Sequence, residues 1–182
     1  MDAVTTLTTE RLILRPWRDD DLALFAALNA DPEVMRFFPH TLDRQRSDAM
    51  ADRIRTRVDE HGWGLWAAEV PDVAAFIGFI GLQPIPFDAP FTPTVEVGWR
   101  LAREHWGRGY APEGAAAALD YAFATLGLDE VVSMTIPDNL PSQRVMQKVG
   151  MTRNPADDFD HPTLAHWDRR AHVLYRLRRP TG

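Results

Sequence analysis

The feature that most constrains the fold of this chain is a glycine-containing turn between an expected strand and an expected helix. The turn spans residues 106–111 and reads Trp-Gly-Arg-Gly-Tyr-Ala. Residues 95–101 before it alternate in the manner of a strand, and the alanine-rich segment 111–126 after it is typical of a helix. This order directs several backbone N–H groups and a helix N-terminus at one point. The sequence therefore predicts a phosphate-binding turn.

The spacing of the glycines excludes two common nucleotide-binding patterns. A P-loop requires Gly-Lys followed by Ser or Thr, and the sequence contains no such tripeptide. The dinucleotide fingerprint requires three glycines at a spacing that Gly107, Gly109 and Gly114 do not match. Among nucleotide-bearing cofactors, coenzyme A remains.

Length and composition are typical of one globular domain covering residues 1–182. The absence of cysteine excludes disulfides, thiolate metal sites and a covalent cysteine intermediate, and the histidine spacing matches no metal-binding motif, so we expect no metal. The net charge of −6 argues against a nucleic-acid partner. Because no apolar run approaches the roughly 20 residues of a membrane helix and no signal peptide opens the chain, we expect no membrane contact and a cytoplasmic location.

The pattern along the chain predicts a mixed α/β or α+β domain. Alternating apolar residues and turn signals predict strands at residues 11–17, 65–70, 75–82, 95–101, 131–136 and 171–177. Capping residues, glycines and helical periodicity predict helices at residues 22–28, 41–60, 111–126 and 139–149. No repeat, linker or low-complexity segment divides the chain.

Three segments in a fixed order, 96–101, 105–113 and 139–151, closely resemble the GNAT acetyltransferases. Together with the opening segment 9–15, they are similar to the group within that superfamily named for the ribosomal-protein N-terminal acetyltransferases RimJ and RimL. The resemblance implies the GNAT fold, in which a central, mixed and mostly antiparallel sheet is splayed at a bulge and flanked by helices. Gly98 would mark that bulge and open the cleft.

The resemblance also implies acetyl-CoA as the cofactor, bound by one set of residues. They are the backbone amides of Gly107, Arg108, Gly109, Tyr110 and Ala111 for the pyrophosphate, the strand edge at Trp99, Arg100 and Leu101 for the pantetheine arm, Asn139 for the pantetheine amides, and Arg144 nearby. Backbone amides and a helix N-terminus stabilise a diphosphate, in agreement with the reading of the turn. Glu104 and Pro112 depart from the residues usual in the family and leave the individual phosphate contacts open.

Glu96 is the candidate general base. It lies on the expected strand beside the cleft, on the same face as Gly98 and Arg100. It would take the proton of the acceptor amine directly or through water. The alternative is a structural ion pair with Arg100 or another arginine. A backbone N–H near Gly98 or Trp99 would stabilise the oxyanion.

Ser142 is the candidate donor to the leaving sulfur. Many GNAT enzymes protonate the thiolate with a tyrosine, and this chain has no tyrosine between Tyr121 and Tyr175. In the RimJ/RimL-like group a serine holds the equivalent place, and Ser142 matches it. Its hydroxyl would donate to sulfur or relay a proton through water. The alternative is a capping role, since Asn139 or Ser142 could cap the helix that follows.

The resemblance implies direct transfer of an acetyl group to an amine acceptor in a ternary complex. The acceptor would be a protein N-terminus or a small-molecule amine. The alternative from a different class is a non-catalytic acyl-CoA-binding sensor or scaffold, which would need the glycine turn but neither Glu96 nor Ser142.

Three further segments have an ordinary interpretation and a functional alternative. The loop 84–93 holds four prolines and could cover a partner, so a homodimer stays open. The mixed arginines and aspartates of residues 43–59 are interpreted as a solvated helix face, with a binding role as the alternative. The acidic residues 157–160 are interpreted as a solvated turn, with a position on the acceptor side as the alternative.

Overall fold

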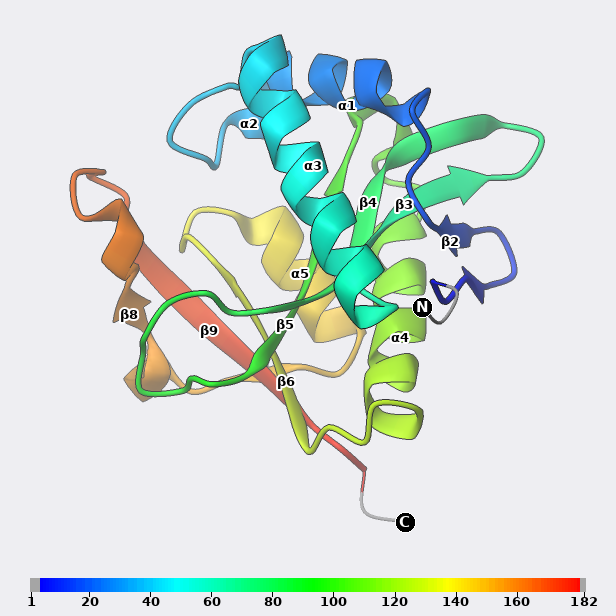
Figure 1. Ribbon diagram of the computed structural model, residues 1–182. Coiled ribbons are helices and arrows are strands. Elements are labelled where there is room, and N and C mark those ends of the chain that lie inside the picture. Colours follow the sequence, from blue (N-terminus) through cyan, green and yellow to red (C-terminus); the bar gives the residue numbers. More distant parts are fainter. Residues whose placement is uncertain (1–3, 181–182) are drawn as a thin grey trace.

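The computed structural model describes residues 4–180, which form an open sheet with helices on both faces (Figure 1). The strand order is β1-β2-β3-β4-β5-β6-β9-β7, and β8 pairs with β9 off this path. The strands are β1 (Leu7–Thr8), β2 (Ile13–Arg15), β3 (Leu65–Val70), β4 (Ala74–Pro84), β5 (Val95–Leu101), β6 (Glu130–Thr135), β7 (Thr152–Arg153), β8 (Phe159–Asp160) and β9 (Ala171–Arg178). All pairs are antiparallel except β5 with β6. The expected fold class, a mixed and mostly antiparallel sheet flanked by helices, is confirmed.

The helices divide between the two faces of the sheet (Figure 1). One face carries α1 (Asp21–Ala30), α2 (Pro32–Met35) and α3 (Arg44–His61), and the other carries α4 (Tyr110–Ala124) and α5 (Leu140–Lys148). Short 3-10 turns complete the chain: η1 (Arg103–His105), η2 (Pro155–Asp157) and η3 (Pro162–Leu164). Each face therefore has its own hydrophobic core.

Small residues let α4 approach the sheet closely. Ala115, Ala118 and Ala122 are fully buried in the core beneath this helix. Gly114 extends the same contact, because a Cβ there would lie 2.5 Å from Cδ1 of Ile80. The alanine-rich composition that predicts the helix also determines how near its N-terminus lies to β4 and β5.

The helix α3 has clear sequence signals at both ends. The side chain of Asp43 caps it by accepting a hydrogen bond from the backbone N–H of Arg46 at 2.8 Å. Gly62, with φ of 74°, ends it in the left-handed conformation. Ile54 and Val58 on its inner face are buried against the sheet. The opposite face is exposed and charged, as the sequence predicts.

The sheet opens beside β5. Strands β5 and β6 pair only at Val95 with Val131 and at Glu96 with Val132, and their pairing ends there. Strand β4, in contrast, pairs with β5 along the whole of β5 with no register shift at Gly98. The expectation of a bulge at Gly98 is therefore wrong: the sheet opens because β6 leaves β5 after Glu96, whereas β5 pairs regularly with β4.

All six strands and four helices expected from the sequence are found, with ends shifted by a few residues. The expectation missed α2 and the short strands β1, β7 and β8. Two-residue strands carry no periodic signal, and β7 and β8 exist because β9 is beside them to pair with. Within residues 4–180, no helix has the length and apolar character needed to cross a membrane.

Candidate active site

The glycine turn joins the open edge of β5 to the start of α4. Gly107 and Gly109 have φ angles of 71° and 85°, a conformation that costs other residues free energy. Gly109 is the N-cap residue of α4. The two glycines therefore let the chain reverse tightly and begin a helix at once, as the sequence predicts.

This turn presents a run of free backbone donors. In the part of the chain that the structure describes, none of the N–H groups of residues 107–111 donates to a protein acceptor. Unsatisfied N–H groups at a helix start, together with the helix dipole, favour a bound anion. The geometry fits the pyrophosphate role predicted for these residues, which stays a prediction about individual contacts.

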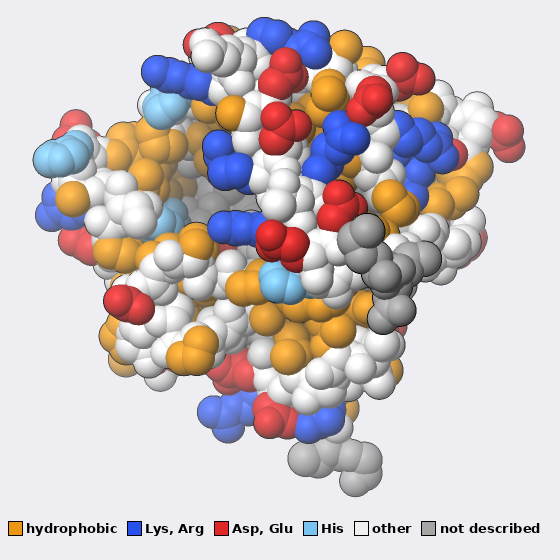
Figure 2. Space-filling view, viewed as in Figure 1, with side chains coloured by type: hydrophobic (Ala, Val, Ile, Leu, Met, Phe, Trp, Pro, Cys, Tyr) orange, Lys and Arg blue, Asp and Glu red, His pale blue; other side chains and the backbone are white. Residues whose placement is uncertain are grey.

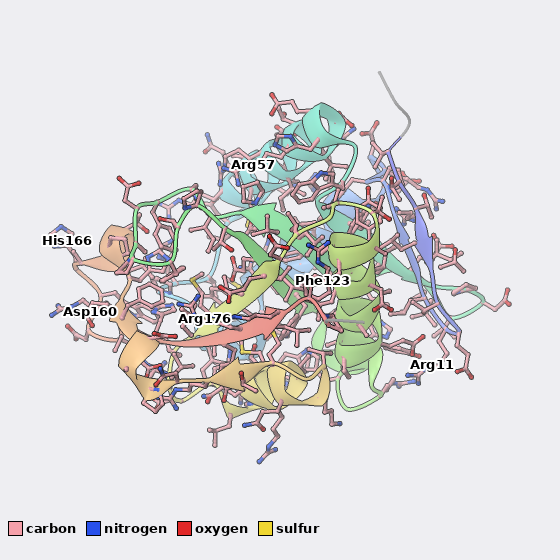
Figure 3. The ribbon with its side chains drawn as sticks, turned by 90° about the horizontal axis from the view of Figure 1, so that it is seen from below. Arg11, Arg57, Phe123, Asp160, His166 and Arg176 are labelled. Atoms are coloured by element: carbon pink, nitrogen blue, oxygen red, sulfur yellow. The ribbon has the colours of Figure 1, made fainter. Side chains whose placement is uncertain are left out.

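The N-terminal segment holds the turn in place. Nη1 of Arg11 donates to the backbone oxygen of Arg108 at 2.9 Å, and Nε of Arg11 donates to Glu113 at 2.7 Å. The hydroxyl of Thr9 donates to the same carboxylate at 2.6 Å. The guanidinium of Arg11, a residue labelled in Figure 3, also lies 5.1 Å from the ring centre of Tyr110. Sequence reasoning missed this clamp, because its partners are about a hundred residues apart.

Glu96 lies where β5 and β6 separate. One of its carboxylate oxygens accepts a hydrogen bond from Nε2 of Gln83 at 2.8 Å. Burial raises the pKa of Glu96 to about 7, against the opposing effect of hydrogen bonds from Gln83 and from the backbone of Met134. In residues 4–180, no cationic side chain forms an ion pair with it. A carboxylate whose pKa is about 7, at the point where two strands part, is suited to general-base chemistry.

Arg100 is not the ion-pair partner of Glu96. Its Nη1 donates to Oδ1 of Asn29 at 2.7 Å, and its guanidinium stacks 4.2 Å from the ring centre of Phe38. Burial lowers the pKa of Arg100 to about 10. Because this side chain is enclosed by α1 and α3, only the backbone of Arg100 remains for the predicted contact along the β5 edge. Trp99, its neighbour, packs against the core on the other face.

The residue that caps the N-terminus of α5 is Asn139. Its Oδ1 accepts from the backbone N–H of Ser142 at 3.3 Å, and its Nδ2 donates to the hydroxyl of Thr135 at 2.8 Å. Ser142 is half-buried, and in residues 4–180 its hydroxyl forms no hydrogen bond. The capping alternative therefore falls to Asn139, and the hydroxyl of Ser142 is available for another role. Arg144 is exposed on the same helix.

Comparison with known protein families identifies the family of this chain. The sequence model described as "Acetyltransferase (GNAT) domain" matches residues 11–152. The chain belongs to the GNAT acetyltransferase family. GNAT acetyltransferases use acetyl-CoA, and this protein is an acetyl-CoA-dependent acyltransferase.

Relatives of this GNAT protein cover most of its length. YkkB of Bacillus subtilis is 35% identical over 152 residues, which are 83% of this chain and 87% of that protein. The FsC-acetyl coenzyme A-N(2)-transacetylase of Aspergillus fumigatus is 33% identical over 159 residues, 82% of this chain and 66% of that protein. An acetyltransferase from Agrobacterium tumefaciens has a similar crystal structure, with a TM-score of 0.78, 30% identity and coverage of 98% and 97% of the two chains.

The structure of Mycobacterium smegmatis RimJ in complex with CoA-disulfide shares the fold of this GNAT protein. The TM-score is 0.76 at 19% identity, and the match covers 96% of this chain and 88% of RimJ. At this identity the likeness concerns the fold.

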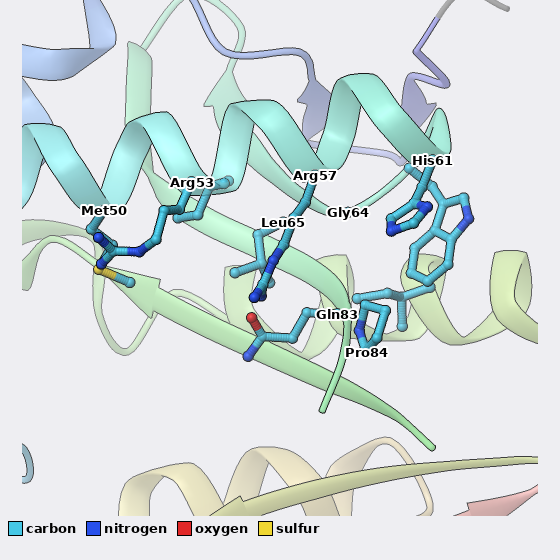
Figure 4. A pocket seen from close by; sticks show the side chains of 11 residues that line it. Met50, Arg53, Arg57, His61, Gly64, Leu65, Gln83 and Pro84 are labelled. Atoms are coloured by element: carbon cyan, nitrogen blue, oxygen red, sulfur yellow. The ribbon is translucent and has the colours of Figure 1, made fainter. Parts of the chain in front are cut away.

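A cavity of about 150 Å³ opens between α3 and the ends of β3 and β4 (Figure 4). Gln83, the hydrogen-bond partner of Glu96, lines it from the sheet. Arg53 and Arg57 line it from α3, and His61 stacks on Trp63 at its end with ring centres 5.7 Å apart. Sequence reasoning missed this cavity, because neither Gln83 of β4 nor Trp63, which precedes β3, belongs to a recognisable motif.

The C-terminal region forms a separate aromatic and ionic cluster. Phe87 of the loop 84–93 lies 4.4 Å from His161, measured between ring centres, and His161 lies 5.0 Å from His172. Burial lowers the pKa of His161 to about 4, so this ring is neutral at physiological pH. Asp160 pairs with Arg170 at 2.8 Å, one of several ion pairs of the acidic turn 157–160. This turn is therefore charge-compensated.

Proposed function

We propose that this GNAT protein transfers the acetyl group of acetyl-CoA directly to an amine in a ternary complex. The observation that carries the proposal is Glu96, a carboxylate with a pKa of about 7 at the point where β5 and β6 part. The amine nitrogen attacks the thioester carbonyl, its proton passes to Glu96 directly or through water, and the C–S bond breaks as coenzyme A leaves.

The cofactor contacts in this proposal follow the geometry of the turn and the open strand. The N–H groups of residues 107–111 hold the pyrophosphate, and the unpaired edge of residues 99–101 takes the pantetheine arm as an additional strand. Asn139 and Arg144 lie on the other side of the opening, at and after the start of α5. A backbone N–H near Gly98 stabilises the oxyanion.

Ser142 protonates the leaving thiolate in this scheme. Support comes from its position in the first turn of α5 and from the assignment of the helix cap to Asn139. A hydroxyl that is not needed for capping can donate to sulfur or relay a proton through water. A sensor or scaffold that only binds acyl-CoA would have no use for Glu96 tuned to neutral pH or for this free hydroxyl.

The acceptor is an amine of either a protein N-terminus or a small molecule. The sequence motifs of the RimJ/RimL-like group support the first. The Aspergillus fumigatus relative is named an N(2)-transacetylase, which agrees with transfer to a nitrogen atom in either case.

Release of coenzyme A tests this function. The purified protein is incubated with acetyl-CoA and a panel of amino acids, polyamines and N-terminal peptides, and free thiol is measured with a chromogenic disulfide. Because the chain contains no cysteine, every thiol detected is coenzyme A. We expect release that depends on one class of amine and product heavier by one acetyl group in mass spectrometry. Binding of acetyl-CoA without release for any amine would favour the sensor alternative.

A further inference from the structure

Two arginines of α3 differ from the other arginines of this helix. Arg44 pairs with Asp48 at 2.8 Å, and Arg55 pairs with Asp19 at 3.0 Å. Arg53 and Arg57 form no ion pair with any carboxylate in residues 4–180. The interpretation of residues 43–59 as a solvated, self-compensating face therefore holds for part of the helix only.

The two unpaired arginines lie on one side of α3, over the cavity beside Gln83. Met50, Arg53, Ile54 and Arg57 are spaced by three and four residues, and all line this cavity. Arg53 is exposed and Arg57 is half-buried. The space-filling view shows basic side chains at the edge of a hollow beside α3 (Figure 2). Among the described residues that line the cavity there is no aspartate or glutamate.

The cavity is connected to the proposed base through one side chain. Figure 4 shows Arg57 directed from α3 toward the amide of Gln83, and Nε2 of that amide donates to Glu96 at 2.8 Å. Gly98, two residues along the same face of β5, leaves the neighbouring space open, since a Cβ there would meet no atom within 4 Å. A molecule lying over Gly98 with one end at Glu96 can therefore reach the arginines of α3.

A third uncompensated cation borders the same region. Arg100 lies on the Glu96 face of β5, and its Nη1 is 3.7 Å from Sδ of Met50, a residue that lines the cavity. Nε of Arg100 is buried without a hydrogen-bond partner in residues 4–180. Arg100 is only 9% exposed, and no carboxylate pairs with it there. The chain carries a net charge of −6, yet three cations without an ion pair in residues 4–180 lie close together here.

We propose that the acceptor amine carries an anionic group, a carboxylate or a phosphate, which Arg53 and Arg57 bind while the amine lies at Glu96. This inference rests on the proposed function and specifies its acceptor. The planar guanidinium binds carboxylate and phosphate oxygens in a bidentate manner, and two such groups without internal partners attract an anion and orient it. Arg100 adds positive potential behind them.

Matched pairs of amines test the inference, because the members of each pair differ in the anionic group. Suitable pairs are amino acids with their amides, phosphoethanolamine with ethanolamine, and N-terminal peptides with Asp or Glu in place of Asn or Gln at the second position. We expect kcat/KM to be about tenfold to a hundredfold higher for the anionic member, as charge-assisted hydrogen bonds provide. The amino-acid and phosphate pairs distinguish the two anions.

The arginines are tested with Arg53→Gln, Arg57→Gln and the double variant. Arg46→Gln is the matched control, because Arg46 is an exposed arginine of the same helix that does not line the cavity. We expect the double variant to lose the preference for the anionic member, because its KM for that member rises toward the KM for the neutral member. The control should keep the preference. The thermal shift with acetyl-CoA should be equal in all four variants, which separates acceptor binding from folding.

Three outcomes would overturn the inference. Neutral members accepted as well as anionic members would overturn it and leave the proposed function standing. A preference for anionic members that survives in the double variant would assign the anion site elsewhere and refute the role of these arginines. Acetylation of no amine, while acetyl-CoA still raises the melting temperature, would refute both the proposed function and this inference.

Discussion

The two ligand sites that we propose on the two sides of the open sheet use different means of recognition. On the α4 side, free backbone N–H groups of residues 107–111 form the proposed cofactor turn, and two glycines with positive φ shape it. On the α3 side, the proposed acceptor region consists of side chains from three elements: Arg57 of α3, Gln83 of β4 and Glu96 of β5. Backbone recognition is encoded within a short segment, whereas side-chain recognition requires the fold to bring distant residues together.

This difference has a functional consequence. A backbone cradle tolerates many side chains but depends on conformation, so the cofactor side can be damaged by a single Cβ. The acceptor side depends on the identity of a few charged and polar groups, so it can change its specificity by substitution without loss of the fold. Variants on each side should therefore affect either acetyl-CoA binding or turnover, and seldom both.

The largest effect is expected for Glu96→Gln. Loss of a general base lowers kcat/KM by about a hundredfold to ten-thousandfold. For the wild type, kcat/KM should rise with pH through an apparent pKa of about 7, because below that pH Glu96 holds a proton and cannot accept another. The variant should lack this limb of the pH–rate profile.

The shift in melting temperature that acetyl-CoA produces is the control for this variant. It should equal that of the wild type, since Glu96 is not part of the cofactor turn. An unchanged rate and pH profile would reduce Glu96 to a structural residue.

A smaller effect, on the opposite side, is expected for Gly109→Ala. At its φ of 85° a Cβ is strained, and it would lie 3.2 Å from Nη2 of Arg11, which holds the turn. We expect the Kd for acetyl-CoA, measured by calorimetry, to increase about tenfold, since left-handed strain costs roughly 1–2 kcal/mol.

Gly127→Ala is the matched control. Gly127 has φ of 67° and lies just beyond the other end of α4, with open space around its Cβ position. The Gly127→Ala variant should lose a comparable free energy of unfolding, while its Kd for acetyl-CoA stays at the wild-type value. Equal Kd values in the two variants would argue against the turn as the pyrophosphate site.

The smallest effect is expected for Ser142→Ala. Loss of the hydroxyl should lower kcat by about tenfold, which is less than the usual effect of losing a proton donor, because water can replace the hydroxyl. The melting temperature should not change, since Asn139 caps α5. Asn139→Ala is the comparison: loss of its cap should lower the free energy of unfolding by about 1 kcal/mol. A decrease in melting temperature for Ser142→Ala with normal kcat would assign Ser142 to structure.

Much of the fold and of the cofactor turn can be predicted from the sequence, because their signals are local. Alternation along residues 65–70 and 95–101 predicts two strands whose bounds the structure reproduces. The glycine at position 62 predicts the end of α3, whereas its start was expected at residue 41 and lies at Arg44, after the cap Asp43. The prediction of a bulge at Gly98 is wrong for a physical reason. The separation of β5 from β6 depends on the path of β6, and the sequence of β5 alone does not indicate that path.

The sequence by itself determined the strand–glycine–helix turn, since positive φ and free N–H groups follow from a few adjacent residues. It also named Glu96 and Ser142, which belong to motifs. Only the tertiary structure decided which ionisable groups have partners. Within residues 4–180, Arg57 pairs with no carboxylate, whereas Arg100 donates to Asn29 and Glu96 accepts from Gln83. Charge compensation and burial depend on residues far apart in the chain. They determine the pKa of the proposed base and the sign of the electrostatic potential in the proposed acceptor cavity.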